Sequence, residues 1–377
     1  MPVQLLTLRL RHAWGVRTGS LIRRPSFRGL WRADVGRTLK SWEKLTQEHQ
    51  GLLRTCRSGN FYTRDKHYKA KFVPTEQRQG CQEKETAYHR NWECPHFAPA
   101  REAMHAEVRH ILPSLPPCTS HHGWILEVPA LPAYRKALTQ LPDTTGSHED
   151  YSERDAGCMH LFVDGSCDYP TQPDLRIATW AVVRADLAGD NFPLISRGVV
   201  PGILQTSGRA ELLATIAALR YGLWQQAPFC IWTGYETPCQ RMRGCMEQRL
   251  ECREDWTNHD LWQRIWQYTR QAMRLGLLWQ VTKALSHLSQ PQLTFEVERW
   301  AARGNQAADV HATVAREDLP GGLRRIRQDL VAQTRWTDRL RDQIHGTLIR
   351  VGQQALRDTN SCWSTTNTKL DQWGPGS

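Results

Sequence analysis

Two acidic residues in this chain occupy positions from which a carboxylate can reach a reacting centre. Asp164 ends the short run 160–163 and is followed by a Gly-Ser turn, and Glu211 lies in the first turn of the helical pattern 209–225. Phosphodiester hydrolysis by two metal ions needs carboxylates from different elements around ions about 3.5–4 Å apart, and Mg²⁺ prefers oxygen ligands. Each residue also has an ordinary interpretation, because Asp-Gly is a common turn pair and an acid at a helix start complements the helix dipole.

The elements that must position these residues follow from the spacing of apolar residues. In chain order the pattern predicts three strands, a helix, a strand, two helices, a strand and a final helix. The predicted strands are 158–165, 177–185, 193–201, 229–233 and 277–283, and the predicted helices are 209–225, 239–250, 260–274 and 305–316. This order predicts an α/β domain, a mixed five-stranded sheet with helices on its faces.

Five runs in this order resemble type 1 ribonuclease H. They are Val163–Ser166, 205–214, Ile231–Thr233, 281–287 and 300–312, the last with Gly-Asn followed by Ala-Asp. The resemblance covers about residues 158–318. It implies a ribonuclease H-like fold and an endonuclease that cleaves the RNA strand of RNA–DNA hybrids with Mg²⁺ or Mn²⁺.

The resemblance also assigns roles to individual residues. Asp164 would be the ligand shared by both metals, Glu211 a ligand of one metal, and Asp309 a ligand at the start of the last helix. His287 would be a mobile histidine that assists proton transfer or product release, a role that suits its ordinary pKa. Contacts to the RNA–DNA hybrid would come from Ser166, Ser207, Arg209 and Asn305.

One expected ligand is missing from this pattern. Members of the family carry an Asp just after the fourth strand, where this chain has Gly234. Glu236 is a candidate rescue ligand. In an extended chain it would lie on the same strand face as residue 234 but about 6–7 Å further along, and its longer side chain or a bulge would recover part of that distance. The alternatives to an active enzyme are a catalytically impaired nucleic-acid-binding module and an inactive retroelement remnant.

A second set of residues has the types that bind zinc. Cys81, His89, Cys94 and His96 lie close together in the sequence, but Arg78 stands where a Cys paired with Cys81 is expected. The segment resembles the zinc knuckle that follows the polymerase domain in non-LTR retrotransposon reverse transcriptases, where a ribonuclease H domain can follow. Whether zinc binds remains open, since a decayed knuckle can fold by packing alone.

Composition bounds the remaining properties. The chain has 377 residues and a net charge of +11. Its 11 Cys favour reduced thiols in an intracellular compartment, either the nucleus or the cytoplasm. Residues 1–33 carry seven Arg and no acid, which fits organellar targeting, a basic arm or a start inside a longer reading frame. No run is apolar enough to span a membrane, and protein partners are not indicated.

The predicted organisation is a basic, partly helical region 1–70, a degenerate knuckle 71–115, a linker 116–157, the ribonuclease H-like domain 158–318, and a helical extension with a disordered tail 319–377.

Overall fold

The computed structural model describes residues 25–40, 42–59, 63–78, 80–147, 157–186, 191–284 and 295–370, with side chains to residue 358. The predicted histidine, His287, lies outside these ranges. Within them the chain forms two compact units. Unit 1 is residues 129–331, and unit 2 combines residues 25–128 with residues 332–370. The division falls inside one long helix, α13 (Gly321–Leu370).

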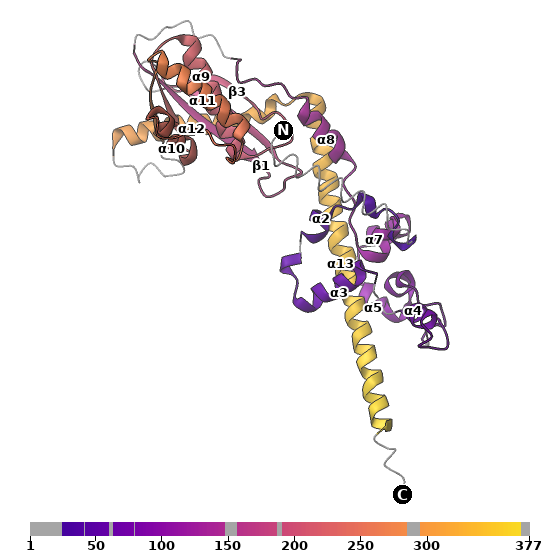
Figure 1. Ribbon diagram of the computed structural model, residues 1–377. Coiled ribbons are helices and arrows are strands. Elements are labelled where there is room, and N and C mark those ends of the chain that lie inside the picture. Colours follow the sequence, from indigo (N-terminus) through magenta and orange to yellow (C-terminus); the bar gives the residue numbers. More distant parts are fainter. Residues whose placement is uncertain are drawn as a thin grey trace. The chain divides into compact units, whose positions relative to one another are not determined.

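Unit 1 is built on a mixed five-stranded sheet with the order β3-β2-β1-β4-β5. Two of its strands, β1 and β3, are labelled in Figure 1. The strands are β1 (Met159–Asp168), β2 (Ile177–Arg184), β3 (Leu194–Val199), β4 (Phe229–Thr233) and β5 (Leu278–Lys283). β2 pairs antiparallel with β1 and with β3, whereas β4 pairs parallel with β1 and with β5. The predicted fold class, an α/β sheet with flanking helices, is confirmed.

Alternate residues of β1 face opposite layers of unit 1, as strand geometry requires. Leu161 and Val163 pack in the large core with residues of α9 (Ser207–Gln225), α10 (Glu236–Met246) and α11 (His259–Arg274). Phe162 belongs to the opposite core, which α12 (Glu296–Val314) supplies with Ala301 and Ala308. The strand that carries Asp164 is therefore covered on both faces.

The last helix of unit 1 begins earlier than the sequence suggested. We predicted a start at Asn305, but α12 begins at Glu296. The Phe295 backbone N–H donates to the Glu298 carboxylate at 3.2 Å, which stabilises the first turn. Asn305 and Asp309 consequently lie inside the helix, and the prediction that they mark its start is wrong.

Unit 2 is a set of short helices around the C-terminal part of α13. The helices are α2 (Val35–Leu39), α3 (Gln47–Arg57), α4 (Arg64–Lys69), α5 (Ala98–Arg101), α6 (Ala106–Ile111) and α7 (Pro117–His122). Leu53 of α3 and Val108 of α6 share one core with Ile344 and Leu348 of α13. Residues 71–115 are therefore built into a larger unit through α13 and do not stand apart.

Two of the predicted boundaries are corrected. The stretch 116–157, predicted as a linker, contains α7 and α8 (Ala130–Thr139). Its prolines suggested a linker, but Pro117 stands at the first position of α7, where a missing N–H costs little. Helix α13 also continues to Leu370, so it takes up most of the stretch 319–377, for which we predicted a helical extension with a disordered tail.

A helix that crosses a bilayer requires about 20 mostly apolar residues. Among the described residues, no helix combines the length and apolar character that crossing a membrane requires.

Candidate active site and Cys/His cluster

A close approach between β1 and α9 places two of the predicted acids together. A Cβ on Gly165 would lie 2.4 Å from the backbone N of Glu211 and 2.8 Å from the Ala210 Cβ. Only glycine permits this contact, because real Cβ atoms do not approach backbone so closely. The carboxylates of Asp164 and Glu211 consequently share a hydrogen bond across the two elements.

A second close approach sets α12 against the other face of β1. A Cβ on Gly304 would lie 2.5 Å from the ring of Phe162. One and a half turns further along the helix, Asp309 lies near enough to interact with Asp164. We call Asp164, Glu211 and Asp309 the acidic site. The three predicted metal ligands thus come from three elements of unit 1.

The acidic site places the half-buried carboxylates of Asp164 and Glu211 side by side. Burial raises the pKa of Glu211 well above its ordinary value, and the charge of Asp164 adds to this effect. Burial also raises the pKa of Asp164, with Asp309 contributing and the hydrogen bond from Glu211 opposing. Within the described part of the chain, the buried Oε2 of Glu211 has no hydrogen-bond partner. These carboxylates therefore need either a proton or a cation to compensate them.

The donor set of the acidic site fits a magnesium ion. All its donors are carboxylate oxygens, the ligands that Mg²⁺ and Mn²⁺ prefer, and the orphaned Glu211 oxygen is available. Asp309 is exposed, so one side of the site is open to solvent. The oxygen atoms of these three carboxylates lie further apart than the donor atoms of a second group. Among the described residues, only Cys81, His89 and Cys94 bring three donor atoms within 4.8 Å of one another.

The position after β4 supplies no fourth carboxylate. Gly234 follows Thr233 directly, and the Tyr235 backbone N–H donates back to the Thr233 hydroxyl at 3.1 Å. Glu236 opens α10, but its two oxygens are bonded to Lys283 Nζ at 2.6 Å and to Gln240 Nε2 at 2.8 Å. Lys283 accordingly lowers the pKa of Glu236. This geometry does not favour the rescue role that we considered for Glu236.

Of the four residues predicted to contact the hybrid, two are hydrogen-bonded to other side chains of unit 1. Arg209 forms two bonds to the Asp260 carboxylate, so the structure uses it to join α9 to α11. Ser166 bonds Thr313 at 3.4 Å. Asn305 is buried in α12, and its Oδ1 has no partner among the described residues. Ser207 is exposed at the first position of α9, which Thr206 caps.

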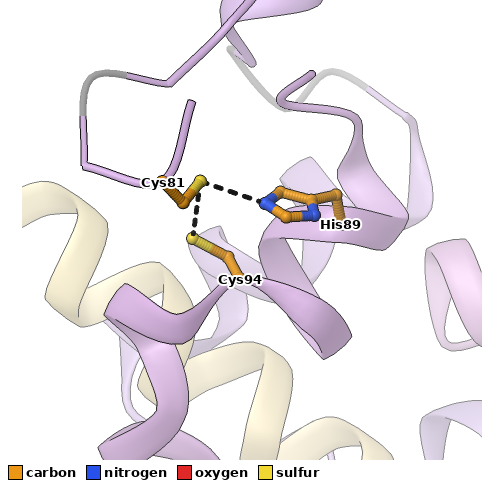
Figure 2. Close-up of side chains that lie close together, drawn as sticks. All are labelled: Cys81, His89 and Cys94. Carbon is orange, nitrogen blue, oxygen red and sulfur yellow. Dashed lines mark hydrogen bonds between the residues drawn. The ribbon is translucent and has the colours of Figure 1, made fainter. Parts of the chain in front are cut away.

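In unit 2 the structure brings together three of the four predicted zinc ligands (Figure 2). The Cys81 Sγ lies 3.3 Å from His89 Nε2 and 3.7 Å from the Cys94 Sγ. Burial raises the pKa of the Cys94 thiol, and the neighbouring Cys81 adds to this. We call these three residues the Cys/His cluster. His96 points elsewhere, with its Nε2 2.7 Å from the Asp358 carboxylate, so its prediction as a ligand is not supported.

One residue of this region was missed by the sequence analysis. Glu93 lies 3.5 Å from His89 Nδ1, the ring nitrogen that faces away from Cys81. Carboxylates commonly orient metal-binding histidines through this second nitrogen. The spacing of four residues, His89 to Glu93, is a signal that could have identified the pair, because such residues face each other on a helix.

Comparisons with known proteins find no family and only distant similarities to solved structures. No protein-family model matches the chain, and no curated protein does. A protease–reverse transcriptase of prototype foamy virus is 16% identical over 45% of this chain and 22% of its own, with a TM-score of 0.32. An N-terminal RNase H domain from Mycobacterium tuberculosis is 12% identical over 42% and 98%, with a TM-score of 0.30. An RNase H1 named LC11, solved with an RNA/DNA hybrid, is 16% identical over 42% and 95%, with a TM-score of 0.29.

Each of these two RNase H structures covers 42% of this chain, and at TM-scores of 0.30 and 0.29 neither carries an argument about its fold. At such identities and TM-scores they carry no argument about activity. The match spans less than a quarter of the foamy virus chain. Function must therefore be argued from the residues of the acidic site.

Proposed function

We propose that the acidic site binds Mg²⁺ or Mn²⁺ and cleaves the RNA strand of RNA–DNA hybrids, at a rate limited by Gly234. The observation that carries the proposal is the buried, orphaned Oε2 of Glu211 beside Asp164, in a site whose carboxylates burial makes hard to ionise. A fold does not retain such a group for stability, because an uncompensated buried carboxylate destabilises it. A divalent cation removes that cost.

Asp164, Glu211 and Asp309 would hold the metal. The bound ion would supply charge stabilisation for the attacking and leaving oxygens of the phosphodiester. The residues of the chain would do the remaining work. Asp164 and Glu211, fixed by the glycine contact, would orient the site, and the exposed start of α9 at Ser207 would offer backbone N–H groups to a phosphate. His287 would assist proton transfer or product release.

Recognition would depend on the shape of the hybrid. A-form geometry, phosphates and 2′-hydroxyls are the features that distinguish such a duplex without base contacts. In this proposal the domain derives from a retroelement, and no sequence specificity is expected.

A second candidate function is a binding module of the same fold without turnover. It is favoured by Gly234, which cannot supply a ligand, and by Glu236, whose oxygens are already bonded to Lys283 and Gln240. Loss of one carboxylate would weaken metal affinity and transition-state stabilisation by several kcal/mol. The two candidates share hybrid binding and differ in cleavage.

Hybrid cleavage by the full chain tests the proposal. The RNA strand of a labelled hybrid is incubated with protein and Mg²⁺ or Mn²⁺, and Asp164→Asn is measured beside the parent. We expect slow cleavage that Asp164→Asn abolishes. Glu247→Gln is the matched control, because Glu247 is an exposed acid of unit 1 paired with Arg249.

Three outcomes separate the candidates. Cleavage that persists in Asp164→Asn would show that the acidic site does not perform the reaction. Hybrid binding without cleavage would favour the module. Neither binding nor cleavage by a folded protein would favour the inactive remnant.

A further inference from the structure

The distances within the Cys/His cluster match those between ligands of a single metal ion. A tetrahedral zinc ion with Zn–S of about 2.3 Å and Zn–N of about 2.0 Å separates two sulfurs by about 3.8 Å, and a sulfur from a nitrogen by about 3.5 Å. The observed separations are 3.7 Å between Cys81 and Cys94 and 3.3 Å between Cys81 and His89 (Figure 2). We propose that Cys81, His89 and Cys94 bind one zinc ion with three protein ligands and a water at the fourth position.

The donor chemistry selects the metal. Two thiolates and one imidazole suit zinc, whereas Mg²⁺ prefers oxygen donors and would go to the acidic site. Two thiolates also balance the charge of the ion while the imidazole stays neutral. Cys94 is fully buried and Cys81 half-buried, so the site is shielded on one side and reachable on the other.

Local backbone structure holds the three donors in place without the metal. Cys81 lies in a turn in which the Gln82 N–H donates to the Arg78 carbonyl at 2.8 Å. His89 and Cys94 stand at the two ends of one π-helical turn, His89–Glu93, which the Cys94 N–H closes on the His89 carbonyl at 2.8 Å. The Glu93 carboxylate lies 3.5 Å from the opposite ring nitrogen, Nδ1, a position from which carboxylates orient metal-binding histidines.

No fourth protein ligand is at hand in the described ranges of the chain. Arg78, three residues before Cys81, bonds Glu85 at 2.6 Å and Asp358 at 3.2 Å, and its guanidinium lies over Phe97. His96 is bonded to the same Asp358. Arg78 and His96 are therefore both bonded to Asp358 of α13, which leaves the fourth position of the zinc to solvent.

Metal content of the full chain tests this site. The reduced protein is loaded with zinc, passed through a desalting column and analysed for bound metal. We expect one zinc per chain in the parent and less than a tenth of that in Cys81→Ser and in Cys94→Ser. Cys252→Ser is the matched control, because Cys252 also lies beside a histidine, with its Sγ 3.8 Å from His259 Nδ1, but the pair belongs to no three-donor set among the described residues.

Two further measurements apply if a serine variant does not fold. In the parent protein, zinc should slow alkylation of Cys81 at least tenfold and leave that of Cys252 unchanged. Cobalt substitution should give the intense visible absorption of a tetrahedral ion with thiolate ligands. Arg78→Cys should raise zinc affinity and shift the cobalt spectrum, because its position one turn before Cys81 supplies the missing sulfur.

The proposal is overturned by a folded, reduced parent protein that retains no zinc and whose Cys81 alkylation zinc does not slow. Equal loss of metal in Cys252→Ser and Cys81→Ser would also overturn it. These readouts do not depend on hybrid cleavage, so they can fail or succeed independently of the acidic site.

Discussion

The acidic site and the Cys/His cluster are assembled in opposite ways. Asp164 and Asp309 are 145 residues apart in the sequence (309 minus 164), and β1, α9 and α12 must pack before the acids meet. The Cys/His cluster lies within residues 81–94 and uses one turn and one helical turn. The acidic site therefore depends on the whole sheet of unit 1, whereas the cluster depends on local backbone structure supported by α13.

The two regions also carry charge differently. Unit 1 keeps two half-buried carboxylates together, and their partial burial raises the pKa of each. Unit 2 keeps a neutral imidazole buried: burial lowers the pKa of His345 to about 3, and Arg57 and Arg341 add to the shift, while its bond to the Gly123 carbonyl opposes it. The proposed metal binding would account for the first arrangement, and packing accounts for the second.

Acid should therefore act on the two units with opposite sign. The folded pKa of His345 is below its ordinary 6.5, so its contribution is intact above pH 6.5 and is lost as pH falls towards 3. By pH 3 the loss is on the order of 5 kcal/mol. The folded pKa of Glu211 is above its ordinary 4.5, so its unfavourable contribution is greatest at high pH and is relieved as pH falls.

Hydrogen exchange of each unit between pH 7 and pH 5 measures this difference. We expect weaker protection in unit 2 and equal or stronger protection in unit 1 after correction for intrinsic rates. His345→Gln should remove most of the acid sensitivity of unit 2. Equal loss of protection in both units would contradict the comparison.

Replacement of Gly165 should break the acidic site alone. A Cβ there meets the Glu211 backbone at 2.4 Å, so Gly165→Ala should destabilise unit 1 by about 3 kcal/mol and abolish cleavage. Gly208→Ala is the matched control, since its Cβ would lie 3.6 Å from the Tyr235 hydroxyl, an ordinary contact. Urea unfolding measures both variants. A zinc content that falls together with cleavage in Gly165→Ala would show that the two sites are not independent.

Neutralising Glu211 should separate activity from stability. Glu211→Gln removes a buried charge beside Asp164, so we expect a higher Tm in metal-free buffer and cleavage at least 100-fold slower. Calorimetry and the hybrid assay measure the two effects. A lower Tm would mean that the Glu211 carboxylate is satisfied in the metal-free protein, contrary to its orphaned Oε2.

Restoring a carboxylate after β4 should have the smallest of these effects. Gly234→Asp adds an oxygen donor at the position where the ribonuclease H resemblance expects one, and we expect cleavage to rise about tenfold, worth about 1.4 kcal/mol. Gly234→Asn is the control of equal size without the charge. A rise with Asn as large as with Asp would attribute the effect to backbone stiffening.

The order of elements in unit 1 could be predicted from the sequence because its strands and helices have clear hydrophobic periods. The five strands lie where the pattern placed them, and β4 ends at Thr233 as predicted. The extent of α12 could not be predicted, because its first two turns carry several charged residues, and Ala301 among them is buried in the core that Phe162 forms on that side of the sheet. The linker prediction failed for a similar reason: Tyr134 and Leu138 of α8 are buried only after the chain has folded.

The candidate sites divide in the same way. The types and order of Asp164, Glu211, Cys81 and Cys94 identify acids and thiols suited to metals, because donor chemistry is a property of single side chains. Tertiary structure decided that Asp164 and Glu211 share a hydrogen bond and that His96 turns to Asp358. Those outcomes depend on distances that packing sets, and a sequence does not specify distances between residues on different elements.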